Sequence, residues 1–89
     1  MRRDFRKFQI LDFLARVGEA TAKEVYEAIP SPPKNPSTLT NHLTHYCKSG
    51  LLKKRFFRGK ALYSLTEKGQ ERLWYFRYVK FKEISALTK

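Results

Sequence analysis

The sequence predicts a small α+β domain that is mostly helical, and three patterns support this. Apolar residues recur at helical spacing over much of the first 50 residues, whereas the pattern from 51 to 65 favours two strands. From 67 to 89 the chain lacks proline and has a glycine only in its first turn, which predicts another helix. At 89 residues, we expect one domain, 1–89, with a small core.

The first helix is expected from Asp4 to Val17, and Gly18 provides its C-terminal stop signal. Its apolar stripe comprises Phe5, Phe8, Ile10, Leu11, Phe13, Leu14 and Val17. The sequence TAKE, residues 21–24, then forms a capping box, in which Thr21 and Glu24 each bind the other's backbone N–H. This box predicts a short second helix that ends at Pro30 and turns Val25, Tyr26 and Ile29 inward.

The third helix follows a stiff, extended connection with prolines at 30, 32, 33 and 36. We expect Ser37 to cap this helix, which runs over 37–49 and stops before Gly50. Leu39, Leu43 and Tyr46 form its buried side, with Cys47 at the margin.

The opposite face of this helix carries short hydrogen-bonding side chains and a lysine. They are Ser37, Thr38, Thr40, Asn41, Thr44, His45 and Lys48. Threonine, asparagine and histidine are mediocre helix formers, so helix propensity does not account for them. Such side chains can bind phosphates and base edges in a DNA major groove, where asparagine pairs with adenine. The alternative is a solvated amphipathic helix.

A β-hairpin is predicted from 51 to 65, with Arg58-Gly59 as a two-residue turn. This turn places Leu52 opposite Leu65 and Phe56 opposite Ala61. The segment 53–60 carries the cations Lys53, Lys54, Arg55, Arg58 and Lys60. Beside a polar helix face such a hairpin can bind phosphates, although a charged strand can also serve only to discourage aggregation.

The net charge of +11 favours a polyanionic partner and salt-dependent association. The excess lies mainly in the second half, because residues 48–82 carry eleven basic and two acidic residues. Together with the polar helix face, this charge indicates double-stranded DNA as the partner.

The order helix, helix, helix, hairpin, helix resembles the winged helix-turn-helix domain, most closely the MarR-like and PadR-like transcription regulators. STLTNHLTHYCKSGLLKK, residues 37–54, is similar to the recognition helix and first wing strand of that family. LYSLTEKG, residues 62–69, is similar to its second wing strand and the start of its last helix. The resemblance implies that 37–48 enters the major groove, that 58–60 forms the wing tip, and that Thr66 caps the last helix. The proline-rich connection is longer than the usual turn of the family.

The last helix, 67–89, is apolar on all sides over its second half, so one small domain cannot cover it. We therefore expect a twofold homodimer built on this helix and on the broad face of the first. The expected interface comprises Phe5, Phe8, Leu73, Trp74, Tyr75, Phe76, Tyr78, Val79, Phe81, Ile84 and Leu87. The alternative is a helix folded back on its own chain. A dimer should bind a palindromic site with half-sites about 34 Å apart.

The sequence contains no pattern that predicts catalysis, a cofactor or a metal site. It has no glycine-rich phosphate loop and no nucleophile elbow. His42 and His45 are three residues apart, but Cys47 projects away from both and no second cysteine completes a ligand set. No apolar run predicts a signal peptide or a membrane span. We expect an intracellular, cytoplasmic protein associated with the nucleoid.

Three functions remain compatible with these patterns. The first is a sequence-specific dimeric transcription regulator, acting as a repressor because no activation segment is visible. The second is an architectural or DNA-segregation adaptor that spreads along DNA from a specific site. The third is a winged domain used for protein–protein contact, against which the basic hairpin argues.

Overall fold

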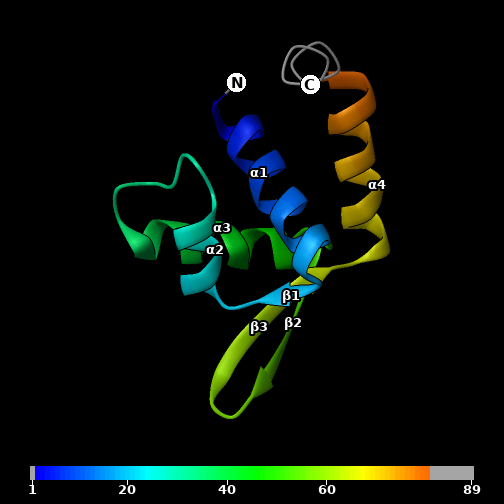
Figure 1. Cartoon of the computed structure of the whole chain (residues 1–89). Helices are drawn as coiled ribbons and strands as arrows, with labels where there is room; N and C mark the ends of the chain where they lie inside the picture. The colour runs from blue at the N-terminus through cyan, green and yellow to red at the C-terminus, as the bar shows by residue number, and fades with distance from the viewer. Residues whose placement is uncertain (1, 81–89) are drawn as a thin grey trace.

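The computed structural model describes residues 2–80 as a three-helix unit, a small sheet and a C-terminal helical segment (Figure 1). The first helices are α1 (Arg2–Val17), α2 (Ala22–Ala28) and α3 (Pro36–Lys48). The strands are β1 (Glu19–Ala20), β2 (Leu52–Phe57) and β3 (Lys60–Leu65). The chain continues as α4 (Glu67–Tyr75) and a π-helical turn, η1 (Phe76–Lys80). The mostly helical α+β class expected from the sequence is confirmed.

The sheet is antiparallel and has the order β1-β3-β2. The register of β2 and β3 is the predicted one, since Leu52 pairs with Leu65 and Phe56 with Ala61. The third strand was not expected from the sequence. In β1, Glu19 and Ala20 pair with Ser64 and Tyr63, so the base of the hairpin is held on both edges. Beyond that base, the hairpin projects away from the helices (Figure 1).

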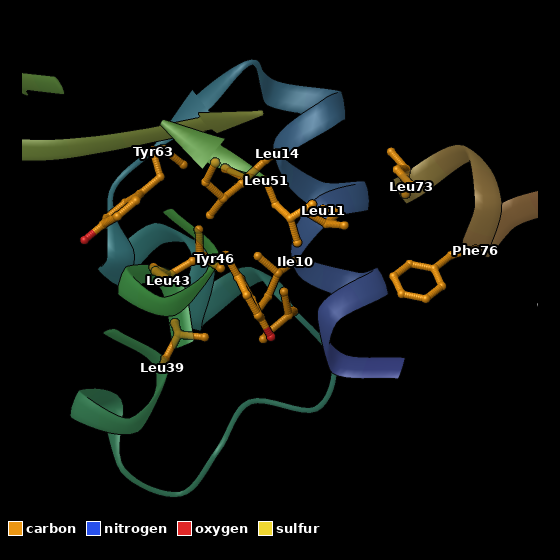
Figure 2. Packing of buried hydrophobic residues seen from close by; sticks show 14 residues of the cluster. Ile10, Leu11, Leu14, Leu39, Leu43, Tyr46, Leu51, Tyr63, Leu73 and Phe76 are labelled. Atoms are coloured by element: carbon orange, nitrogen blue, oxygen red, sulfur yellow. The ribbon is translucent and has the colours of Figure 1, made fainter. Parts of the chain in front are cut away.

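The core lies between α1, α3 and the base of the sheet (Figure 2). Its fully buried members include Ile10, Leu11, Leu14, Val25, Leu39 and Leu43. Phe5, Phe8 and Phe13 pack against this core while remaining partly exposed, and Val17 is 50% exposed. The stripe predicted for α1 therefore forms its inner face, except at its C-terminal end, where Val17 extends beyond the core.

The capping box of α2 forms as predicted. The Glu24 backbone N–H donates to the Thr21 hydroxyl at 3.2 Å, and the Thr21 N–H donates to the Glu24 carboxylate at 2.8 Å. The proline-rich connection after α2 is held at two points. The Tyr26 hydroxyl donates to the carbonyl of Lys34 at 3.1 Å, and Arg6 Nε donates to that of Ser31 at 2.9 Å.

Thr66 joins the hairpin to α4. Its backbone N–H donates to the Leu51 carbonyl at 3.1 Å, and its hydroxyl oxygen lies 2.5 Å from the Gly50 carbonyl oxygen. The same hydroxyl accepts from the Gly69 N–H at 3.0 Å, which makes Thr66 the N-cap of α4, as the resemblance implied. Gly69 itself is buried against Leu51, so α4 begins in close contact with the start of β2.

The C-terminal segment differs from the single helix predicted over 67–89. The α-helix ends at Tyr75 and is followed by the wider turn of η1, while residues 81–89 lie outside the described residues. Leu73 and Phe76 point toward α1 (Figure 2) and are 5% and 2% exposed. The expectation that these two side chains face a second chain was therefore wrong, because their spacing of three places both on α1. The ring of Phe76 meets that of Phe8 edge-on at 6.3 Å.

Asp12 of α1 fixes the end of this segment electrostatically. Its carboxylate accepts a hydrogen bond from Arg77 at 2.5 Å and forms an ion pair with Arg16 at 2.7 Å. The Asp12 side chain is 15% exposed, so this carboxylate lies largely out of solvent between two guanidinium groups. The contact joins η1 to the middle of α1.

Candidate nucleic-acid interface

The third helix begins differently from the sequence-based expectation. Asn35, not Ser37, is the N-cap, and Pro36 occupies the first helical turn. The Asn35 side chain accepts from the Ser37 N–H at 3.0 Å and from the Ser37 hydroxyl at 2.8 Å. Proline is favoured at the first helical position because its missing N–H would have no partner there. The Asn-Pro pair is the sequence signal for this start, although both residues were expected to lie in the connection.

The outer face of α3 presents the polar side chains that the sequence predicted. Leu39, Leu43 and Tyr46 are buried on the inner side. On the outer side Thr38 and Thr44 are partly buried, and the exposed residues are Ser37, Thr40, Asn41, His45 and Lys48. Within the described chain, no hydrogen bond occupies the amide of Asn41. That amide is therefore available to pair with the edge of a base.

The hairpin formed by β2 and β3, called the wing below, is exposed at every residue from 53 to 60. The turn residues Arg58 and Gly59 both have positive φ, at 53° and 79°. Positive φ at both positions is the mark of a type I′ turn, whose twist matches that of paired strands. Lys53, Lys54 and Lys60 lie on the same exposed ribbon. The wing is therefore a twisted, cationic projection beside α3.

Arg55 differs from the other wing cations because it already has an anionic partner. Its guanidinium donates two hydrogen bonds to the Glu19 carboxylate, at 2.8 and 2.6 Å. These hydrogen bonds lower the pKa of Glu19, and the nearby charges of Arg55 and Lys53 act in the same direction. Contact of Arg55 with DNA stays a prediction, and it would compete with this ion pair. No sequence pattern predicts the ion pair between Glu19 and Arg55, because the two residues come together only when β1 pairs with β3.

The His42, His45 and Cys47 group does not gather into a metal site. Within residues 2–80, no three His, Cys, Asp or Glu side chains come together in a way that could hold an ion. The ring of His42 lies 6.3 Å from that of Tyr46. Burial raises the pKa of the Cys47 thiol, which favours the uncharged form over the thiolate that binds metals.

A second exposed surface lies on the C-terminal segment and consists of Trp74, Tyr75, Tyr78 and Val79. These side chains are 61%, 43%, 56% and 54% exposed. The rings of Trp74 and Tyr78 are in contact, with their centroids 5.2 Å apart. Phe5 and Phe8 pack partly on the core, and Phe81, Ile84 and Leu87 lie outside the described residues. Among the described residues of the predicted interface, these four are the exposed ones.

None of the helices described is both long and apolar enough to pass through a bilayer.

Neither the models of protein families nor the curated proteins gave a match to the chain. Comparison with the solved structures did give matches. A Bordetella bronchiseptica protein, BpsR, whose DNA binding is regulated by 6-hydroxynicotinic acid, superposes with a TM-score of 0.73 at 22% identity. The match covers 93% of this chain and 57% of BpsR.

Two further structures have higher sequence identity. A MarR family transcriptional regulator from Streptomyces coelicolor is 28% identical with a TM-score of 0.66, covering 79% of this chain and 49% of that one. A homodimeric winged helix-turn-helix DNA-binding domain from Mycobacterium bovis, a possible ArsR-family regulator, is 26% identical with a TM-score of 0.65. That match covers 92% of this chain and 70% of the domain.

The chain spans about half the length of the first two of these structures. Across that span the order of elements agrees with what the resemblance implied, with β1 as one added short strand. The protein therefore has the winged helix-turn-helix fold found in MarR-family and ArsR-family transcriptional regulators.

Proposed function

We propose that the protein is a sequence-specific, dimeric DNA-binding transcription regulator that acts as a repressor. The observation that carries this proposal is the outer face of α3, where exposed polar side chains and Lys48 lie opposite the buried leucines. A structural helix would gain more from Glu and Lys at these positions, because they are better helix formers. Short donors and acceptors are instead the groups that distinguish base pairs in the major groove.

In the proposed complex α3 lies in the major groove and the wing contacts the neighbouring backbone or minor groove. Asn41 is the candidate for reading a base, since asparagine can pair with adenine through two hydrogen bonds. Lys53, Lys54, Arg58 and Lys60 bind phosphates, which position the protein without reading sequence. With Arg55 bound by Glu19, the wing contributes four cations that form no ion pair within the described residues.

Dimerisation is proposed through the exposed surface of Trp74, Tyr75, Tyr78 and Val79. These four apolar and aromatic side chains are exposed on one short segment, and exposed apolar area of this kind commonly marks a contact surface. The homodimeric state of the Mycobacterium bovis domain is consistent with this arrangement. Two copies related by a twofold axis would present their α3 helices to a palindromic site with half-sites about 34 Å apart.

The first experiment selects bound fragments from random duplex DNA and then maps the site by footprinting. A regulator protects one palindromic segment, whereas a spreading adaptor protects a segment that lengthens as protein concentration rises. Recovery of no preferred sequence would refute sequence-specific binding.

The second experiment replaces Asn41 with alanine and compares the selected duplex with random DNA. We expect affinity for the selected duplex to fall by about 1–3 kcal/mol, roughly 5- to 150-fold, and affinity for random DNA to change little. Glu27→Ala, at an exposed position on α2, is the control and should change neither affinity appreciably. An equal loss on both duplexes would mean that Asn41 reads no base.

The third experiment removes wing charge with Arg58→Ala and Lys60→Ala together. Each lost phosphate contact should reduce the slope of log affinity against log salt by about 0.9, so the double variant should lose about 1.8. Lys23→Ala with Arg72→Ala removes the same charge from α2 and α4 and is the matched control. If the slope falls equally in both double variants, only net charge matters and the wing has no defined place on DNA.

A further inference from the structure

The tip of the wing carries two large apolar side chains that phosphate binding does not require. Phe56 is 70% exposed and Phe57 is 51% exposed. Most of the other exposed large apolar residues of the described chain belong to the C-terminal surface defined above. The wing is thus a second place where apolar area remains in solvent, and such area on a small protein commonly marks a binding surface.

The two rings lie on opposite faces of the ribbon, because successive strand residues alternate. Phe57 pairs with Lys60 at the last rung before the turn, and Phe56 pairs with Ala61 at the rung behind it. The type I′ turn at Arg58 and Gly59 lets the two strands stay paired up to the tip. The rings are therefore held at the end of a paired ribbon and not in a loose loop.

At least one cation lies against each ring. The guanidinium groups of Arg55 and Arg58 lie 5.5 and 5.2 Å from the ring centroid of Phe57. The ammonium group of Lys54 lies 5.5 Å from that of Phe56. An apolar surface with positive charge around it is complementary to a nucleic acid, where phosphates border stacked apolar bases. A second copy of this cationic tip or a neutral apolar surface would lack that charge complementarity.

The dimensions indicate what contact with a duplex would require. The minor groove of B-DNA is about 6 Å wide, whereas a β-layer with side chains on both faces occupies about 10 Å. A ribbon with a phenyl ring on each face can enter only if the groove opens. Proteins open this groove by inserting apolar side chains at a base step, which partly unstacks the step and bends the duplex toward the major groove.

We propose that the wing tip enters the minor groove, where Phe56 or Phe57 acts as an apolar wedge that partly unstacks one base step and bends the DNA. This inference rests on the proposed function, since it takes duplex DNA as the partner. It adds a source of specificity that hydrogen bonds do not provide. Pyrimidine–purine steps unstack most readily, so the wing should favour such a step at a fixed distance from the bases that α3 contacts.

The test uses a 30-base-pair duplex recovered by the selection, with a fluorophore at each end and 2-aminopurine at the step beneath the wing. Wild-type protein should raise energy transfer between the ends, as expected for a bend of about 20–90°, and should raise 2-aminopurine emission. The variant with Phe56→Thr and Phe57→Thr keeps good strand formers but lacks the rings. It should bind with an unchanged salt slope while neither signal rises.

The Arg58→Ala, Lys60→Ala variant is the matched control for the wedge. At saturating protein it should bend the duplex as the wild type does, although it binds more weakly. A threonine variant that bends DNA as fully as the wild type would overturn the wedge. It would leave the proposed function standing, whereas a wild-type protein that binds no duplex at low salt would overturn the proposed function.

A second measurement needs only the wild-type protein and so does not depend on how a variant folds. A duplex with a single mismatch at the step beneath the wing is already partly unstacked, so a wedge should bind it about tenfold or more tightly than the intact duplex. Equal affinity for the two duplexes would overturn the proposal. Sedimentation of the threonine variant completes the test, because loss of self-association with unchanged bending would assign the rings to a protein contact.

Discussion

The contact between Gly69 of α4 and the backbone of Leu51 predicts that Gly69→Ala destabilises the protein. A Cβ atom at position 69 would lie 2.0 Å from the Leu51 carbonyl oxygen and 3.1 Å from its carbonyl carbon. An unstrained carbon–oxygen contact is about 3.3 Å, so helix and strand must separate by about 1.3 Å. The Leu51 oxygen also accepts from the Thr66 N–H, and that separation would stretch this hydrogen bond.

Two opposing effects determine the size of this change. Overpacking costs about 1–3 kcal/mol, and a lost hydrogen bond with its helix cap costs roughly 2 kcal/mol more. Alanine is favoured over glycine within a helix by about 1 kcal/mol. The net loss in the free energy of unfolding is therefore about 2–4 kcal/mol. For a domain of this size, that lowers the melting temperature by at least about 8 °C.

Urea denaturation followed by circular dichroism, at one protein concentration for all variants, measures this loss. Gly18→Ala is one control, because Gly18 has φ +88° but no atom near its Cβ position. It should cost about 1–2 kcal/mol through backbone strain alone. Gln70→Ala, at an exposed position of the same helix, should change stability by less than about 0.5 kcal/mol. A Gly69→Ala protein as stable as the wild type would refute the close approach.

Two further predictions concern charge and assembly. Because the pKa of Glu19 is lowered, its ion pair with Arg55 stabilises the fold above the ordinary carboxyl pKa and is lost on acidification through the lowered value. The stability difference between wild type and Glu19→Gln should therefore shrink as the pH falls below about 4.3, and a constant difference down to pH 2 would contradict this. Trp74→Ser should yield a folded monomer in sedimentation equilibrium, whereas Val17→Ser, also at an exposed apolar position, should leave the wild-type mass unchanged. Equal masses for all three proteins would remove Trp74 from the interface.

Local signals in the sequence were sufficient for most of the helical unit and the hairpin. The capping box at Thr21, the buried stripe of α3 and the Leu52–Leu65 register all depend on residues close in sequence or on a two-residue turn. The start of α3 was misplaced because two adjacent capping signals compete, and Asn35 with Pro36 outweighs Ser37.

The errors elsewhere concern contacts between distant residues. The strand β1 has only two residues, too few for any periodic pattern, and Glu19 reaches Arg55 only after this strand pairs with β3. Part of the apolar surface predicted for the last helix belongs to the chain's own core. Periodicity shows which apolar side chains share a helix face, but not whether α1 or a second copy covers that face. Leu73 and Phe76 were therefore assigned to the wrong partner.

Arg58 adopts a left-handed backbone conformation, with φ at 53°, that glycine and asparagine tolerate better. Replacement by either residue would favour closure of the hairpin while removing a guanidinium from its tip. Under the proposed function, the demands of folding and of phosphate binding conflict at this position, and arginine favours the second. Selection for thermal stability alone would favour replacing this arginine, and under the proposed function the resulting protein would melt at a higher temperature and bind DNA more weakly.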